Sequence, residues 1–277
     1  MSSHFIKVDS ELTIHYEETG KGNQTVLLIP GWTMSTRVYE HQLSFFESSS
    51  DYRFITFDPR AQGLSSKTNG GHFYPQHGKD LHHFIEELKL ENFILGGWSF
   101  GTLATLAYIN QFGSSKLSGF IMLDGPPRAS GGDNTREWVT YRYDDADGIN
   151  QFYTYGKLED SMLSNREFAA WLFEDATDKR VQWAIEMTLQ TPNSAAALLN
   201  ASSSFLDYEA DLIDLHGKIP LWYMMRESQN TVSNNWSRIH TPSAKIDAFG
   251  EHMMFWERSD EFNALLLSFA RQCFNPS

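Results

Sequence analysis

The stretch Phe93-Ile94-Leu95-Gly96-Gly97-Trp98-Ser99-Phe100-Gly101-Thr102-Leu103-Ala104 decides the fold class of this chain. It opens with a short apolar run typical of a buried strand, and after Gly101 apolar residues recur at helical spacing. A strand, a tight Gly-x-Ser-x-Gly turn and a helix in this order predict a nucleophile elbow, in which a strained turn exposes the hydroxyl of Ser99. The alternative interpretation is an ordinary glycine-rich turn with an uninvolved serine.

Apolar runs on both sides of this stretch alternate with helical patterns. Strands are predicted at 25–29, 52–57, 93–95, 120–123, 221–225 and 244–249, helices at 36–48, 76–89 and 259–272, and a hairpin at 4–19. Continuous apolar strands are typical of a parallel sheet that is buried on both faces. The sequence therefore predicts an α/β fold with a mostly parallel central sheet flanked by helices, and a ligand site at the carboxyl ends of the strands.

The segment 126–217 differs from the rest of the chain. It contains no strand-like run, is rich in Trp, Tyr and Phe, and has helical patterns at 165–175, 178–189 and 193–203. We therefore expect two parts: a core formed by 1–125 and 218–277, and a helical cap, or lid, formed by 126–217.

Composition restricts the partners of the protein. The formal net charge is −13, which argues against nucleic acid and anionic membranes because there is no basic excess to replace counterions. The N-terminus lacks a basic region followed by an apolar run, and no run reaches the roughly 18 apolar residues of a membrane span, so we expect a soluble cytoplasmic protein. The expected partner is a small-molecule substrate, and the sequence leaves the formation of a homo-oligomer open.

Cysteine and metal-ligand motifs are sparse. The single cysteine, Cys273, excludes an intrachain disulfide and makes a catalytic thiol a poor hypothesis. The sequence contains neither His-Glu-x-x-His nor Cys-x-x-Cys, so we expect no metal and no cofactor.

Four motifs give the chain a resemblance to the α/β-hydrolase superfamily. They are Ile-Pro-Gly-Trp at 29–32, Asp-Pro-Arg-Ala-Gln-Gly-Leu-Ser at 58–65, Gly-Trp-Ser-Phe-Gly at 97–101, and Gly-Glu-His at 250–252 before the closing helix. Within the superfamily the chain is most similar to the esterase and non-haem haloperoxidase-like group. It departs from the family pattern at Pro30, where His is common, and at Ala61-Gln62, where Gly-His is usual, but neither change touches the nucleophile.

The resemblance implies a catalytic triad in the chain order Ser, acid, His. Ser99 would be the nucleophile, and His252 the base that activates it. Many relatives carry the acid after the strand that here ends near Met225, where this chain has no aspartate, whereas some carry it after the preceding strand. Asp124 stands at that second position and is the first candidate, with Glu227 as the alternative acid; a turn-capping carboxylate is the other interpretation of Asp124.

The same resemblance implies an oxyanion hole made by the backbone N–H groups of Trp32 and Phe100. Asp58 also lies at a strand end, but its motif predicts a turn braced by Arg60.

Aromatic and thioether side chains near these positions predict a largely apolar substrate pocket. The candidates for its lining are Trp98, Trp138, Tyr141 and Met253. The alternative is that most aromatic residues of 126–217 pack the core of the cap itself.

These patterns favour a serine hydrolase acting on a small, apolar or aromatic carboxylic ester through an acyl-enzyme on Ser99. The motif at 30–32, together with Arg37-Val38-Tyr39 and an acid directly after the strand ending at Leu123, also resembles cofactor-independent dioxygenases of hydroxyquinolone-like rings. A ligand-binding receptor that retains the triad is the third hypothesis.

Overall fold

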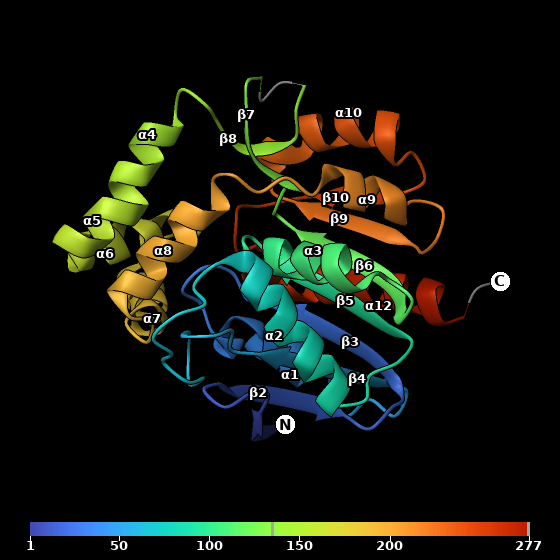
Figure 1. Ribbon diagram of the computed structural model, residues 1–277. Coiled ribbons are helices and arrows are strands. Elements are labelled where there is room, and N and C mark those ends of the chain that lie inside the picture. The colour runs from blue at the N-terminus through green and yellow to red at the C-terminus, as the bar shows by residue number, and fades with distance from the viewer. Residues whose placement is uncertain (134–135, 276–277) are drawn as a thin grey trace.

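The protein is built around one eight-stranded sheet (Figure 1). The computed structural model describes residues 1–133 and 136–275. The strand order is β1-β2-β4-β3-β5-β6-β9-β10, and β3 to β6, β9 and β10 run parallel. Strands β1 and β2 are antiparallel to each other, and β2 is antiparallel to β4. The α/β fold with a mostly parallel sheet is therefore confirmed.

The strands of this sheet have the following bounds: β1 Ser2–Lys7, β2 Thr13–Gly20, β3 Gln24–Ile29, β4 Tyr52–Phe57, β5 Phe93–Trp98, β6 Leu117–Leu123, β9 Leu221–Met225 and β10 Lys245–Ala248. Every residue of β5 and β9 is buried. Their continuous apolar sequence follows from this position, because helices cover both faces of the central strands and leave no solvent-facing side.

Helices pack on the two faces of the sheet. Those of the core are α1 Glu40–Phe46, α2 Tyr74–Glu87, α3 Gly101–Phe112, α9 Glu209–Leu215, α10 Asn230–His240, α11 Met254–Glu257 and α12 Ser259–Phe274, with 3₁₀ turns η1 Thr36–Tyr39 and η3 Glu227–Gln229. Gln42 of α1 donates to Asn263 of α12 (2.9 Å), so these two helices share one face. Asn110 of α3 and Trp236 of α10 both donate to α9, which groups these helices on the other face.

The segment 126–217, which we call the insertion, adds further elements beside the carboxyl ends of the strands (Figure 1). They are β7 Arg128–Gly131, β8 Val139–Arg142, α4 Ala146–Ile149, the π-helical turn η2 Asn150–Tyr155, α5 Gly156–Glu159, α6 Ser161–Trp171, α7 Asp178–Thr188 and α8 Asn193–Ser203. Helices α4 to α8 form a group at one side of the sheet, whereas α9, the last helix of the insertion, lies beside β9 and α10 in the core.

The expectation of a strand-free insertion is wrong. Strands β7 and β8 form a small two-stranded parallel sheet of their own. Each has only four residues, and Arg-Ala-Ser-Gly in β7 contains no apolar run, so the sequence pattern carries no signal for it.

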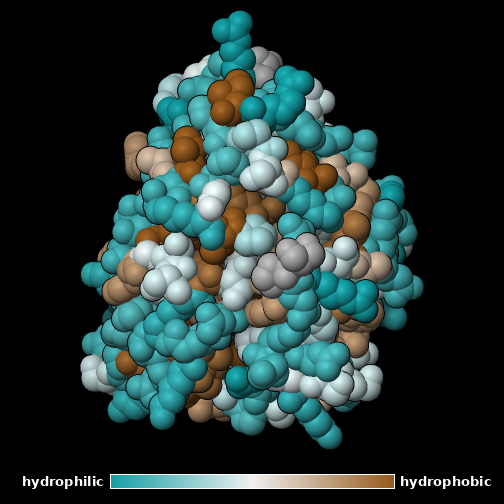
Figure 2. Space-filling view, turned by 90° about the vertical axis from the view of Figure 1, so that its right-hand side faces the viewer, coloured by the Kyte–Doolittle hydropathy of each residue, from teal (hydrophilic) through white to brown (hydrophobic). Residues whose placement is uncertain are grey.

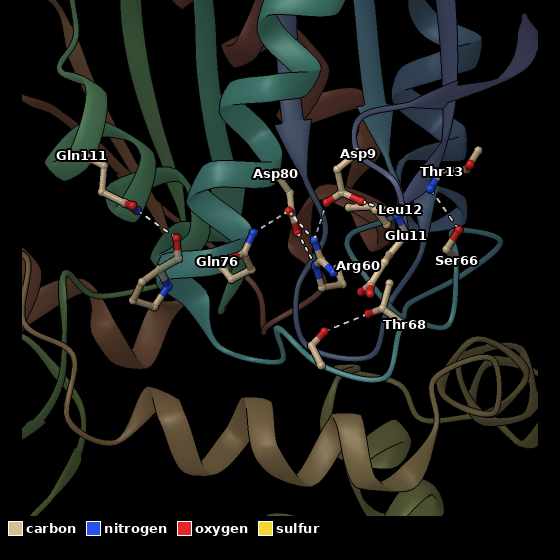
Figure 3. A network of polar contacts seen from close by, with 12 residues as sticks. Asp9, Glu11, Leu12, Thr13, Arg60, Ser66, Thr68, Gln76, Asp80 and Gln111 are labelled. Carbon is tan, nitrogen blue, oxygen red and sulfur yellow. Dashed lines mark hydrogen bonds and ion pairs between the residues drawn. The ribbon is translucent and has the colours of Figure 1, made fainter.

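The loop after β4 is held by a polar network that the sequence pattern assigned to the wrong partners (Figure 3). Arg60 binds Asp80 of α2 through Nε and Nη2, at 2.7 Å each, and reaches Asp9 at 3.3 Å. Asp58 does not pair with Arg60. Its carboxylate instead accepts hydrogen bonds from the backbone of Thr36 (2.6 Å), in the turn after β3, and of Leu64 (2.7 Å), in the loop after β4, and it contacts the ring of His15.

The outer surface is largely polar. Figure 2 shows the side that bears α12, turned away from α4 to α8, and hydrophilic residues cover most of it with hydrophobic ones scattered between them. Within 1–133 and 136–275, none of the helices combines the length and the apolar character that crossing a bilayer requires.

Candidate active site

Ser99 occupies the sharp turn between β5 and α3. Its φ angle is +53°, a left-handed conformation that is strained for a non-glycine residue, and its N–H donates to Leu123 (2.8 Å) at the end of the neighbouring strand. The turn closes because two glycines touch: a Cβ on Gly97 would lie 2.3 Å from the carbonyl carbon of Gly101. The strained turn expected from the sequence is therefore present, and it directs Ser99 to the carboxyl edge of the sheet.

His252 and Asp124 meet at the same edge. Asp124 follows β6 directly with a φ of +44°, and His252 lies in the turn between β10 and α11. The Nδ1 atom of His252 contacts Oδ2 of Asp124, and the two side chains are 4% and 1% exposed. The indole N–H of Trp98 donates to the carbonyl oxygen of His252 (3.0 Å), which ties the base to the elbow strand.

The charges of this pair are set by burial and by a neighbouring arginine. Burial lowers the pKa of His252, the carboxylate of Asp124 partly offsets this effect, and the guanidinium of Arg226 adds to the lowering. Burial alone would raise the pKa of Asp124, but His252 and Arg226 outweigh it and hold that pKa below its usual value. The structure therefore supports a neutral imidazole beside an ionised carboxylate at neutral pH.

The second ring nitrogen of His252 is available for chemistry. Its Nε2 is buried and has no hydrogen-bond partner among the described residues. Ser99 and His252 line the same cavity, but no hydrogen bond joins their side chains within 1–133 and 136–275. An imidazole whose Nδ1 faces a carboxylate can accept a proton at Nε2.

Trp32 and Phe100, whose backbone amides were expected to form the oxyanion hole, both line the cavity. Within the described part of the chain, neither N–H donates a hydrogen bond to the protein. Phe100 is the N-cap residue of α3, so its N–H is one of the groups that a helix start leaves unpaired. Two free amides beside Ser99 can donate to an oxyanion.

The cavity has a volume of about 250 Å³ and is mostly apolar. Its aromatic lining residues are Trp32, Phe100, Trp138, Tyr141, Tyr153, Phe168 and Trp171. Of the four residues expected in the pocket, Trp138 and Tyr141 lie in its wall. Trp98 and Met253 do not: both are fully buried outside it. The indole N–H of Trp98 bonds to the carbonyl oxygen of His252, and the backbone N–H of Met253 bonds to Leu172.

The two candidate acids lie in different places. Asp124 is in the cavity wall and contacts His252. Glu227 begins the 3₁₀ turn η3 after β9, is exposed, and is absent from the lining; its backbone N–H donates to Gly250 (3.0 Å). The structure thus brings Ser99, Asp124 and His252 together and leaves Glu227 outside.

Arg226 is a residue of this site that sequence reasoning missed. It follows β9, where many relatives would carry the acid, and it lines the cavity. The absence of an aspartate there was visible in the sequence, but the direction of an arginine side chain after a strand was not. Within the described residues, no cluster of three His, Cys, Asp or Glu side chains is arranged to hold a metal ion.

Comparison with known proteins identifies the family. A family model described as "alpha/beta hydrolase fold" matches residues 24–252, which includes all the elements from β3 to β10 but not β1, β2 and the closing helices α11 and α12. The chain belongs to the α/β-hydrolase fold family.

Relatives within the α/β-hydrolase fold family cover nearly the whole chain. A Synechocystis sp. protein named "Putative non-heme chloroperoxidase" is 26% identical over 93% of this chain and 95% of its own. The crystal structure of a bromoperoxidase from Bacillus anthracis shares 24% identity, with a TM-score of 0.85 and coverage of 98% and 100% of the two chains. An esterase from Exiguobacterium antarcticum shares 21% identity, with a TM-score of 0.83 and the same coverage. The expected membership of the α/β-hydrolase family is therefore confirmed, and the similar proteins include ones named as an esterase and as haloperoxidases.

Proposed function

We propose that the protein is a serine hydrolase that cleaves a small, apolar or aromatic carboxylic ester through an acyl-enzyme on Ser99. One observation carries this proposal: the carboxylate of Asp124 faces Nδ1 of His252, Nε2 of the same ring has no hydrogen-bond partner among the described residues, and His252 and Ser99 border one cavity. This is the arrangement by which an acid orients a histidine to activate a serine.

The chemistry follows from these positions. Oγ of Ser99 attacks the ester carbonyl as its proton passes to Nε2 of His252, and Asp124 stabilises the imidazolium that forms. The negative charge develops on the carbonyl oxygen, to which the amides of Trp32 and Phe100 donate. The C–O bond to the alcohol then breaks, the alcohol takes the proton from His252, and a water molecule activated in the same way releases the acid.

The missing bond between Ser99 and His252 is compatible with this mechanism, because catalytic hydrogen bonds are often long before substrate binds. Rotation of the Ser99 side chain changes the position of Oγ without moving the backbone.

The cavity supports a small substrate. Its volume of about 250 Å³ lies just below the range of about 300–1,000 Å³ that is common for ligand pockets. Tyr153, Phe168 and Trp171 come from the insertion and form part of the wall, so we propose that the insertion acts as a cap over the site. Aromatic walls with few polar groups favour an aryl or short acyl ester over a charged or long-chain one.

The proposal is tested with p-nitrophenyl acetate and a fluorophosphonate probe. The wild type should hydrolyse the ester and be labelled at Ser99, whereas Ser99→Ala should lose both. Ser50→Ala, which changes an exposed loop serine, is the matched control and should retain both. Equal turnover by Ser99→Ala and the wild type would discard the mechanism.

The place of the acid favours a second candidate. Asp124 follows β6, as in the cofactor-independent dioxygenases that the sequence also resembles, and there the His-Asp pair deprotonates a ring hydroxyl. Oxygen consumption with a 3-hydroxy-4-quinolone, retained by Ser99→Ala and abolished by His252→Gln, would favour that reaction over ester hydrolysis.

A further inference from the structure

Arg226 fixes both oxygens of the carboxylate that faces His252. Its backbone N–H donates to Oδ1 of Asp124 (3.2 Å), and its Nη1 donates to Oδ2 (2.9 Å), the same oxygen that contacts His252. Nη1 also lies 3.3 Å from Nδ1 of His252. A carboxylate held at two oxygens by one residue cannot rotate away from the imidazole without breaking a charge-assisted hydrogen bond.

The guanidinium itself is held from two other directions. Its Nε donates to Oγ of Ser228 (3.1 Å), and its carbon lies 5.3 Å from the ring centroid of Trp171 at the end of α6. The same Trp171 ring lies 4.5 Å from the His252 ring, centroid to centroid. The insertion therefore covers Arg226 and His252 together, and the Arg226 side chain is only 19% exposed.

We propose that Arg226 is a positioning residue of the Asp124–His252 pair: it locks the orientation of the carboxylate and places a positive charge beside the ring of His252. The proposal rests on the proposed function only where it takes His252 to be the base. No charged side chain other than Asp124 and Arg226 borders the cavity in the described part of the chain.

The electrostatic balance around His252 supports this role. Burial lowers the pKa of His252, Asp124 raises it, Arg226 lowers it and the adjacent Glu251 raises it. Of these three charges, Arg226 is therefore the one that opposes protonation of the ring. A unit charge at this distance in a buried site typically moves a pKa by about 1 or more. Removal of the charge should raise the pKa of His252, so that the imidazole becomes protonated, and inactive as a base, at a higher pH than in the wild type.

The direct test is an NMR titration of the histidine rings in the full-length protein. The signal of His252 among the ten histidines is assigned from its loss in His252→Gln. In Arg226→Gln we expect the pKa of His252 to rise by about 1. In Arg226→Lys, which keeps the positive charge but lacks the planar guanidinium group, the pKa of His252 should stay closer to the wild-type value. Arg238→Gln, an exposed arginine of α10 that does not line the cavity, is the charge-matched control and should leave the titration unchanged.

The acidic limb of kcat/KM provides the second readout. In Arg226→Gln the pH at which kcat/KM falls on the acidic side should rise by the same amount as the pKa of His252. At a pH below this limb in both proteins, kcat/KM of the variant should therefore be about tenfold lower than that of the wild type, and at pH 8 the difference should be much smaller. A purely structural role would lower kcat/KM equally at all pH values. If Arg226→Gln does not fold, Arg226→Met takes its place, since it keeps the aliphatic stem.

The outcomes separate this inference from the proposed function. An unchanged or lowered pKa of His252 in the folded Arg226→Gln protein, or a rise of the same size in Arg226→Lys, would overturn the role of Arg226. The NMR titration needs no substrate, so it decides this even if Ser99→Ala shows that the ester hydrolysis does not use Ser99.

Discussion

The replacement Asp124→Asn should nearly abolish the activity. The carboxylate stabilises the imidazolium that His252 becomes in the transition state, and both side chains are almost fully buried. Two unit charges at about 4 Å interact by about 4 kcal/mol at an effective dielectric constant of 20, which corresponds to about 10³ in rate. The amide also favours the wrong tautomer of the ring, and such a change in a serine triad costs about 10⁴ in kcat. We therefore expect a loss of 10³–10⁴.

The assay is the initial rate of p-nitrophenyl acetate hydrolysis at saturating substrate, with circular dichroism to confirm that the variant is folded. Glu227→Gln is the matched control: it removes an exposed carboxylate after β9, outside the cavity, and should keep kcat within about twofold of the wild type because screened surface charges contribute little. A folded Asp124→Asn protein that retains more than a tenth of the wild-type kcat, or a larger loss in Glu227→Gln, would refute the assignment of the acid.

Three further predictions concern stability. Burial lowers the pKa of His77 to about 4, so between pH 6.5 and 4 the unfolded chain binds one more proton than the folded chain, and the free energy of unfolding of the wild type falls by about 3 kcal/mol. The free energy of unfolding of His77→Leu, measured with urea, should fall less over this range. Equal decreases in the two proteins would contradict this prediction. Burial lowers the pKa of Lys157 to about 8, and within the described residues its ammonium group donates only to Asn165. The free energy of unfolding of Lys157→Met should therefore be about 1–2 kcal/mol higher than that of the wild type at pH 7, and this difference must shrink as pH rises from 8 to 10.5. In Gly101→Ala the new Cβ would lie 2.5 Å from the carbonyl oxygen of Ile29, so the free energy of unfolding, measured by thermal unfolding, should fall by about 1–3 kcal/mol. An unchanged Tm would contradict the close packing of the elbow.

Local patterns in the sequence were sufficient for the fold. The apolar runs at 25–29, 52–57 and 221–225 correspond almost residue for residue to β3, β4 and β9. A strand that is buried on both faces is apolar along its whole length, so its bounds can be recognised in the sequence. The helix expected at 36–48 is a 3₁₀ turn followed by α1. The helices expected at 178–189 and 193–203 are α7 and α8, the one expected at 165–175 is α6 and begins four residues earlier, and α9 was not predicted. Where elements are short and polar, as in β7, the pattern failed.

The candidate site was predicted in part. A Gly-x-Ser-x-Gly turn between a strand and a helix identifies Ser99 from the sequence alone, because the geometry of the turn depends on residues that are adjacent in sequence. The acid could not be decided in the same way. Asp124 and Glu227 each follow a strand of the same sheet edge, and which carboxylate faces His252 depends on side-chain directions across three separate strand ends.

Sequence alone determined the parallel strands of the large sheet, the elbow and the Gly-Glu-His turn that carries the histidine, because hydrophobic periodicity and turn chemistry are local properties. Only the tertiary structure decided that Asp124 lies against His252, that Trp98 is buried outside the cavity and not in its wall, and that Arg226 holds the carboxylate. These contacts join residues more than 100 positions apart in the chain, and their geometry is set by the twist and register of the sheet, which no local pattern records.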